Sequence, residues 1–220
     1  MAGPARRAIM RGMLTVPSGP ERAEIVVLHS RFIASLEYAD SVAEARAFVA
    51  RVRREFPDAS HHVPAFILGG GNSSTEFCAD DGEPSGTAGR PLLAALKGSG
   101  LGNAAIVVTR YFGGTLLGTG GLVKAYSEAG RRVLERTKRS ALVELSGYRL
   151  ELPYGIFEGF RSLASDCGAT IAEEEFDERV RVFVEVPREE CGRFEARLAD
   201  LGSGAVAAKR EASRTGRRPL

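Results

Sequence analysis

The sequence predicts an α+β protein of two domains, and three observations support this prediction. Short alternating or continuous apolar runs, typical of strands, are interspersed with segments whose apolar residues recur at helical three- and four-residue spacing. The charge balance changes along the chain: residues 1–140 carry 18 Lys and Arg against 13 Asp and Glu, whereas residues 141–208 carry 7 against 14. Residues 148–209 also show a repeated strand and helix order, βαββαβ.

The composition is that of an ordinary soluble globular protein. Of the 220 residues, 44% are hydrophobic and 26% are charged. No run of about 18 apolar residues occurs, so we expect no membrane partner. The twin arginine near the N-terminus has no apolar segment behind it, so it does not predict a signal peptide, and we expect a cytoplasmic protein. Cys78, Cys167 and Cys191 are odd in number and widely spaced, which argues against a disulfide framework or a zinc site.

Composition also suggests where the domains begin and end. Residues 1–20 lack hydrophobic periodicity, and we expect a disordered lead there. We place an N-terminal α/β domain at 21–140 and a ferredoxin-like domain at 141–210. Residues 211–220, rich in arginine, are expected to form a basic disordered tail.

The first elements are a hairpin and a helix. Residues 24–38 predict an antiparallel hairpin whose connection lies at His29-Ser30-Arg31. Ser41 and Glu44 have the spacing of a capping box, which predicts a helix over 42–56. The outer face of that helix carries arginines that indicate either a solvated surface or a nucleic-acid patch; they are Arg46, Arg51, Arg53 and Arg54.

A strand with two adjacent histidines comes next. We expect strands at 61–68 and 75–79, joined by a glycine-rich turn. His61 and His62 are neighbours in the first strand and should point to opposite faces of the sheet, so they are poorly placed to chelate one metal together. A hydrogen-bonded histidine near a site is the functional alternative.

The remaining elements alternate regularly. The N-terminal domain continues with a helix at 89–97, a strand at 104–109 and a helix at 120–136. Five cations at the end of that last helix suit the negative end of its dipole; they are Arg131, Arg132, Arg136, Lys138 and Arg139. The second domain is expected to contain strands at 148–152, 170–175, 179–186 and 204–209 and helices at 155–166 and 188–201. This is the split-βαβ ferredoxin-like plan, and its acidic surface does not favour nucleic-acid phosphate.

Two glycine-rich loops between residues 80 and 127 carry the candidate functional residues. In the first, acidic loop they are Asp80, Asp81, Glu83, Ser85, Thr87 and Arg90. Three carboxylates within four residues repel one another and need a cation, a positive side chain or backbone donors nearby, and Arg90 and Arg110 are candidates for the positive side chain. They could bind Mg²⁺, act as a general base or recognise a cationic partner, or they could simply cap backbone amides of the turn and the following helix.

The second loop is basic and aromatic. Its candidate anion-binding residues are Arg110, Tyr111, Gly113, Gly114, Gly118, Thr119, Gly120, Gly121 and Lys124. Glycines let the backbone approach a ligand, and a helix start offers unpaired amides to phosphate or carboxylate. Neither a Walker A loop nor a GxGxxG fingerprint is present, and a tight structural turn is the alternative interpretation. Arginine and aromatic residues beside an anion pocket would also suit RNA.

The same loops carry a family resemblance. DDGEPSGTAGRP at 80–91 and RYFGGTLLGTGGLVKAYSEA at 110–129, preceded by SRFIA at 30–34, resemble the two-domain bacterial branch of the IMPACT/YigZ family. The resemblance covers about residues 20–210. It implies an N-terminal domain with the fold shared by ribosomal small-subunit protein five and domain IV of elongation factor G. It also implies a ferredoxin-like second domain similar to domain V of that factor.

One segment departs from the family pattern. Residues 61–66 read HHVPAF, where the family more often has an ATHNCYAY-like run, so the resemblance implies no catalytic role for this strand. The wider fold group contains small-molecule kinases with a glycine-rich loop before a helix, to which residues 113–121 could be similar.

These observations lead to two functional hypotheses. The first is a non-enzymatic, translation-associated protein that binds RNA, the ribosome or a protein partner through Arg110, Tyr111, Lys124 and the arginines of the helix at 42–56. No metal or other cofactor is expected in that function, and the oligomeric state stays open. The alternative is a phosphate- or nucleotide-binding enzyme with phosphate on the amides of 118–121 and Mg²⁺ on the acidic-loop carboxylates.

Overall fold

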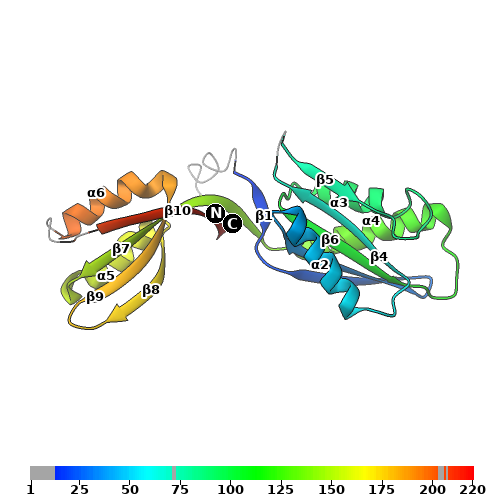
Figure 1. Ribbon diagram of the computed structural model, residues 1–220, viewed down its shortest axis with the longest axis horizontal. Helices are drawn as coiled ribbons and strands as arrows, with labels where there is room; N and C mark the ends of the chain where they lie inside the picture. The colour runs from blue at the N-terminus through cyan, green and yellow to red at the C-terminus, as the bar shows by residue number, and fades with distance from the viewer. Residues whose placement is uncertain (1–12, 71–72, 203–205, 207) are drawn as a thin grey trace. The chain divides into compact units, whose positions relative to one another are not determined.

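The structure is a computed structural model that describes residues 13–70, 73–202, 206 and 208–220 (Figure 1). It confirms an α+β fold with two compact units. The first unit contains the chain up to Ala141 together with Arg217–Leu220, and the second contains Leu142–Gly216. The boundary falls within one long strand, β7 (Arg139–Leu152).

The first unit is built on a sheet of five antiparallel strands in the order β2-β3-β6-β4-β5. The strands are β2 (Glu21–Val27), β3 (Ser30–Tyr38), β4 (His61–Leu68), β5 (Thr75–Cys78) and β6 (Ala104–Tyr111). The central strand β6 is buried over nearly its whole length, so residues near its end lie close to the core.

The hairpin connection between β2 and β3 differs from the prediction. Val27 pairs with Ser30, and only Leu28 and His29 form the loop, with φ of 44° and 65°. Two residues with positive φ match the right-handed twist of the flanking strands. Neither residue is glycine, asparagine or aspartate, so this turn has little signature in the sequence.

Helices cover both faces of this sheet (Figure 1). They are α2 (Val42–Glu55), α3 (Gly89–Gly98) and α4 (Gly118–Arg136). On one face, Phe48 of α2 packs with Phe66 of the sheet. On the other face, Leu92 of α3 and Tyr126 of α4 pack with Ile106. The two helical layers therefore present their outer surfaces to different sides of the unit.

The capping box starts α2 as predicted. The backbone N–H of Glu44 donates to Ser41 Oγ at 3.3 Å, and the carboxylate of Glu44 accepts from the backbone N–H of Asp40 at 3.1 Å. The two interactions satisfy donors at the helix start that have no partner within the helix.

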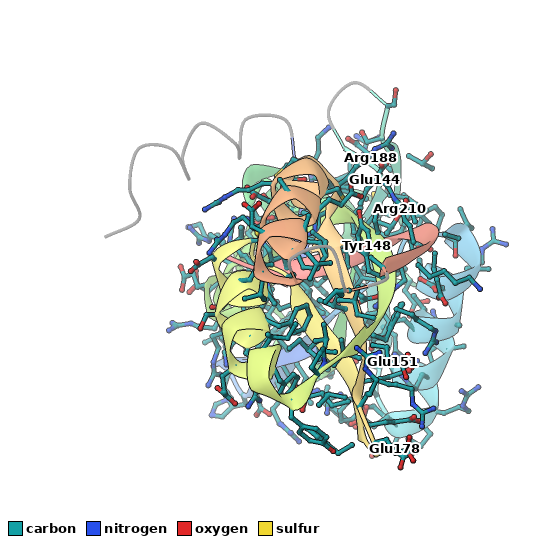
Figure 2. The ribbon with its side chains drawn as sticks, turned by 90° about the vertical axis from the view of Figure 1, so that its left-hand side faces the viewer. Glu144, Tyr148, Glu151, Glu178, Arg188 and Arg210 are labelled. Carbon is teal, nitrogen blue, oxygen red and sulfur yellow. The ribbon has the colours of Figure 1, made fainter. Side chains whose placement is uncertain are left out.

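The second unit has the predicted ferredoxin-like βαββαβ plan. Its elements follow one another as β7, α5 (Tyr154–Asp166), β8 (Thr170–Phe176), β9 (Val180–Pro187), α6 (Cys191–Gly202) and β10 (Ala208–Pro219), with a short helix η1 (Arg188–Glu190) before α6. The strand order is β8-β9-β7-β10. Phe160 of α5 and Phe194 of α6 share one core with Tyr148 of β7, so both helices lie on the same face of the sheet. In Figure 2, Arg188 and Glu144 form an ion pair at one end of the unit, and Glu178 marks the β8–β9 turn at the other.

The face of this sheet opposite the helices carries paired charges. Arg149 lies 3.1 Å from Glu173 and 2.8 Å from Glu211, and Arg181 lies 3.3 Å from Glu175. These charges neutralise one another on the surface, so this face offers few free cations to a phosphate-bearing partner.

The predicted disorder at the two ends of the chain needs correction. Residues 1–12 lie outside the described part, but Thr15–Pro17 form β1, which pairs with the start of β7. The predicted disordered tail at 211–220 is wrong, because β10 extends to Pro219 and pairs with β7. The basic composition of this segment suggested disorder, but the acidic partners of the arginines lie on other elements. Arg214 pairs with Glu185 of β9, and Arg210 lies 3.8 Å from Glu195 of α6. Of the strand predicted at 204–209, residues 204, 205 and 207 lie outside the described residues, and Ala208 and Lys209 begin β10.

Within the described residues, no helix has the length and apolar character needed to cross a bilayer.

Candidate functional site

Asp80, the first carboxylate of the acidic loop, caps helix α3. Its oxygens accept hydrogen bonds from the backbone N–H groups of Gly86, Ala88 and Gly89 at 2.8, 3.1 and 2.8 Å. Burial opposes ionisation of the carboxyl group, but these three hydrogen bonds outweigh it and lower the pKa of Asp80. The capping alternative considered from the sequence is therefore what the structure has at this position.

Asp81, the second carboxylate, ties the loop to β4 and α2. The backbone N–H of His62 donates to its Oδ2 at 2.7 Å, and Arg53 pairs with its Oδ1. Burial again opposes ionisation, and the two partners together lower the pKa of Asp81.

Glu83, the third carboxylate, lies in a buried polar cluster. Arg110 Nη1 lies 2.7 Å from Glu83 Oε1 and 3.0 Å from Oε2, and the Tyr126 hydroxyl donates to Oε1 at 2.7 Å. Burial and the bond to Glu83 both raise the pKa of Tyr126, so its hydroxyl stays protonated as a donor. All three carboxylates of the loop thus bind donors within the fold.

The expected contact of Arg110 with RNA phosphate is wrong. Arg110 points to the α3–α4 face of the sheet, where only 6% of its side chain is exposed and Glu83 neutralises it. Its Nη2 donates to Ser30 Oγ at 3.4 Å, and its guanidinium lies over the rings of Phe32 and Phe112. Its Nε has no hydrogen-bond partner among the described residues. A strand residue at the core cannot reach an external phosphate backbone.

The side chains of the two adjacent histidines point to opposite faces of the sheet and have different hydrogen-bond partners, as alternation along a strand requires. His61 Nδ1 lies 2.8 Å from the carbonyl oxygen of Asp81, which assigns the proton of the neutral ring to Nδ1. Its Nε2 then lies 3.9 Å from Glu83 Oε1. His62 is buried, and its Nε2 lies 2.9 Å from the carbonyl oxygen of Phe56 at the end of α2. Across the described ranges, no cluster of three or more His, Cys, Asp or Glu side chains could hold a metal.

The second loop is shorter than predicted, because α4 begins at Gly118 and takes up the glycines expected to precede it. The four residues Gly118, Thr119, Gly120 and Gly121 form the first turn of the helix. Leu117 occupies the N-cap and offers no side-chain hydrogen bond, and the first turn has no acidic residue. The start of α4 therefore keeps the positive partial charge of its N–H groups.

Gly113 and Tyr111 have structural roles in this loop. A Cβ on Gly113 would lie 2.1 Å from the carbonyl carbon of His29, so only glycine allows the loop to cross the β2–β3 turn. The Tyr111 hydroxyl donates to Asp58 at 2.9 Å. Gly114, with φ of 82°, supports the turn that follows.

A pocket of about 430 Å³ lies at the start of α4. It is lined by His61, Glu83, Pro84, Arg110, Phe112, Leu116, Leu117, Gly118, Thr119 and Leu122. The structure thus brings together five residues singled out in the sequence: His61, Glu83, Arg110, Gly118 and Thr119. The lining does not include the other charged or hydroxyl-bearing candidates, which are Asp80, Asp81, Ser85, Thr87, Arg90, Tyr111 and Lys124. Sequence reasoning missed the apolar wall, although the adjacent leucines of a glycine-rich loop were a usable signal.

The exposed surface of α3 and α4 is basic. These helices carry Arg90, Lys97, Lys124, Arg131, Arg132 and Arg136 against Glu128 and Glu135. Lys97 pairs with Glu76, and Glu128 is shared by Arg131 and Arg132. Within the described part of the chain, Arg90, Lys124 and Arg136 have no carboxylate partner. The arginines of α2 lie on the opposite side of the sheet, so the single surface expected from the sequence does not form.

Comparison with known proteins agrees with this architecture. Residues 28–134 match the Impact N-terminal domain, and residues 150–205 match a domain of unknown function, DUF1949. These matches define a two-domain protein of the Impact type. The chain belongs to the IMPACT family, which confirms the resemblance found in the sequence.

The relatives cover nearly the whole chain. The IMPACT family member YigZ of Escherichia coli (strain K12) is 40% identical over 192 residues, which are 87% of this chain and 94% of YigZ. The IMPACT family member YvyE of Bacillus subtilis (strain 168) is 32% identical over 199 residues, or 89% of each chain. A crystal structure described as that of a hypothetical protein is 39% identical, with a TM-score of 0.60, and the match covers 89% of this chain and 95% of that one.

Proposed function

We propose that this protein is a non-enzymatic, translation-associated factor that binds RNA, free or within the ribosome, through the exposed surface of α3 and α4. The observation that carries the proposal is the excess of cations over carboxylates on these two helices, with Arg90, Lys124 and Arg136 lacking a carboxylate partner in the described part of the chain. When unpaired surface cations neutralise phosphates, the counterions condensed on the nucleic acid are released. This release drives the association of the protein with nucleic acid.

The dimensions of α4 suit a phosphate backbone. Its 19 residues give a length of about 28 Å, and the exposed stripe of the helix carries Lys124 near its start and Arg131 further along. Such a stripe can contact several successive phosphates of a single strand.

The competing magnesium-dependent function receives less support. Asp80 accepts from three backbone amides, and Asp81 and Glu83 each hold an arginine. A metal ion on these carboxylates would have to displace those donors. In the second unit, charges on the sheet face opposite the helices are paired with one another, which favours the first unit as the RNA-binding half.

A titration of fluorescent single-stranded RNA and of purified ribosomes at several salt concentrations tests the proposal. The test variant Arg90→Gln with Lys124→Gln removes two unpaired cations from the α3–α4 surface. The matched control Arg46→Gln with Arg54→Gln removes two exposed cations from α2, where neither has a carboxylate partner in the described residues.

The test variant should weaken binding and reduce the slope of log K against log salt by about 1.5, whereas the control should bind as the unchanged protein does. Absence of RNA and ribosome binding at low salt would contradict the proposal. An equal loss in both variants would show attraction by net charge alone. Selective capture of a protein partner by the same surface, without RNA, would also count against it.

A further inference from the structure

The second unit exposes a pair of aromatic rings at one end. Tyr154, the first residue of α5, is 53% exposed, and Phe176, the last residue of β8, is 57% exposed. Their ring centroids lie 6.4 Å apart, with an angle of 30° between the ring planes. We call these two residues the aromatic patch.

The fold holds the two rings of the aromatic patch in place. The Tyr154 hydroxyl donates to the carbonyl oxygen of Asp177 at 2.6 Å, which ties the start of α5 to the β8–β9 turn. Phe157 belongs to the core of the unit, and Phe176 packs on it edge to face with ring centroids 5.5 Å apart. Because the rings are fixed before a partner arrives, binding to them loses little side-chain entropy.

The segments that carry the aromatic patch are acidic. Residues 154–161 and 174–181 contain five carboxylates against three arginines. Two of these arginines are each shared by two carboxylates: Arg161 by Glu158 and Glu174, and Arg181 by Glu175 and Asp177. Glu178 in the β8–β9 turn (Figure 2) and its neighbour Arg179 are exposed, and neither forms an ion pair with another described residue. The net negative charge favours a cationic partner and disfavours nucleic acid or an anionic membrane.

Arginines elsewhere in this chain show which cation fits such a surface. Arg149 lies over the ring of Phe183, 4.9 Å from its centroid, and pairs with Glu173 at 3.1 Å. Among the described residues, no arginine lies over the ring of Tyr154 or Phe176 in this way. The patch therefore has the rings and the carboxylates of this arrangement without the cation. A guanidinium is planar, weakly hydrated and suited to stacking on rings, whereas the ammonium of lysine is a strongly hydrated point charge.

We propose that the aromatic patch binds an arginine side chain in a basic, extended segment of a partner protein. The guanidinium stacks on the exposed rings of Tyr154 and Phe176, and Glu178 supplies a carboxylate beside it. The patch belongs to the second unit, whereas the RNA-binding surface lies on α3 and α4 of the first. The two surfaces therefore differ in charge and in the class of partner that they bind.

Fluorescence anisotropy of short labelled peptides, titrated with the full chain, tests the proposal. The first peptide alternates glycine with arginine, and three matched peptides carry lysine, glutamine or glutamate in place of arginine. The arginine peptide should bind saturably and several-fold more tightly than the lysine peptide, and the other two should not bind. Absence of binding by the arginine peptide at low salt, or equal binding of the arginine and lysine peptides, would overturn the proposal.

Two charge reversals in the second unit locate the binding. Glu178→Lys changes the carboxylate beside the aromatic patch and should weaken binding of the arginine peptide roughly fivefold or more. Glu189→Lys is the matched control, because Glu189 is also exposed and lies next to Arg188 at the opposite end of the unit (Figure 2). The control should bind within about twofold of the unchanged protein. Equal weakening by both variants would mean attraction by net charge alone and would overturn the assignment to the patch.

A third variant tests the aromatic ring itself. Phe176→Leu keeps an apolar side chain against Phe157 but removes the ring face, and it should weaken binding roughly three- to tenfold. Its unfolding temperature should stay close to that of the unchanged protein. Unaltered binding by Phe176→Leu would overturn the proposal. So would sedimentation of the unchanged protein as a dimer and of Phe176→Leu as a monomer, because a second copy would then cover the patch.

Discussion

Arg110 of β6 and Glu83 of the acidic loop form a buried ion pair, with Nη1 2.7 Å from Oε1 and side chains 6% and 3% exposed. Tyr126 of α4 completes the cluster by donating to the same carboxylate oxygen. The pair connects the loop before α3, the central strand and α4. It therefore fixes the position of the pocket and of the helix start that borders it.

Removing one partner of this pair should be costly. Glu83→Gln leaves a buried guanidinium without a counter-charge, and we expect the free energy of unfolding to fall by about 3–5 kcal/mol. The exposed pair of Glu24 with Arg31 is the control, and Glu24→Gln should cost at most about 1 kcal/mol. Urea unfolding measures both. A loss below 1 kcal/mol for Glu83→Gln would contradict the buried pair.

Asp80 should stabilise the protein as a helix cap. Asp80→Ala removes the acceptor of three backbone N–H groups at the start of α3, and we expect a loss of about 1–2 kcal/mol, with a smaller loss for Asp80→Asn. Because the folded pKa of Asp80 lies below its ordinary value of 3.8, its contribution is present above that pH and disappears as the pH falls through the folded pKa. Acid unfolding of Asp80→Ala should therefore be less steep below about pH 4. An unchanged acid profile would contradict the capping role.

His62 should make the protein less stable in mild acid. Burial lowers its pKa below the ordinary value of 6.5, so the unfolded chain takes up a proton before the folded one does. The free energy of unfolding should consequently decrease as the pH falls from about 7 toward the folded pKa. His62→Gln should flatten this dependence in urea unfolding between pH 7.5 and 5.5, and His29→Asn on the exposed hairpin turn is the control. A slope unaltered by His62→Gln would exclude this histidine as its source.

Two glycines near the pocket should respond to alanine in opposite ways. A Cβ at Gly113 would overlap the backbone of His29, and we expect Gly113→Ala to destabilise the protein by about 1–3 kcal/mol. A Cβ at Gly120 meets no atom within 4 Å, and its helical position favours alanine by about 0.5–1 kcal/mol. Thermal unfolding separates the two. A loss of stability for Gly120→Ala would contradict a helical position for this residue in the first turn of α4.

Strand β10 should be essential to the second unit. Truncation after Lys209 removes most of the strand that pairs with β7, together with the Arg214 partner of Glu185. Amide hydrogen exchange should then be faster along β7. Thermal unfolding should show a lower unfolding temperature for this unit. Unchanged protection of β7 would instead be the behaviour of a disordered tail.

The fold was largely predictable because its signals are local. The capping box at Ser41, helical apolar spacing and the βαββαβ order each depend on neighbouring residues. The prediction failed where partners lie far apart in the sequence. Arg214 of the supposed tail is neutralised by Glu185, and the glycines at the start of α4 are held helical by tertiary packing of Leu122 and Tyr126.

Some of the candidate site residues come together at one pocket, namely Glu83, Arg110, Gly118 and Thr119. That they form a functional site stays a prediction. The sequence left two roles open for Arg110, pairing with an acidic-loop carboxylate or contact with phosphate, and its burial against Glu83, 27 residues earlier, shows that it takes the first. His61 and Leu116 join the pocket only through sheet register and loop crossing. The residue types predict an anion near α4. Which cations remain free to contact a partner depends on burial, and burial is visible only in the structure.

Binding of RNA by α3 and α4 is tested by an amide chemical-shift map of the ¹⁵N-labelled protein during titration with single-stranded RNA at low salt. We expect shifts on α3 and α4, strongest around Arg90, Lys124 and Arg136, with little change on α2. Shifts confined to α2 or to residues 142–216, or no shifts at all, would contradict it.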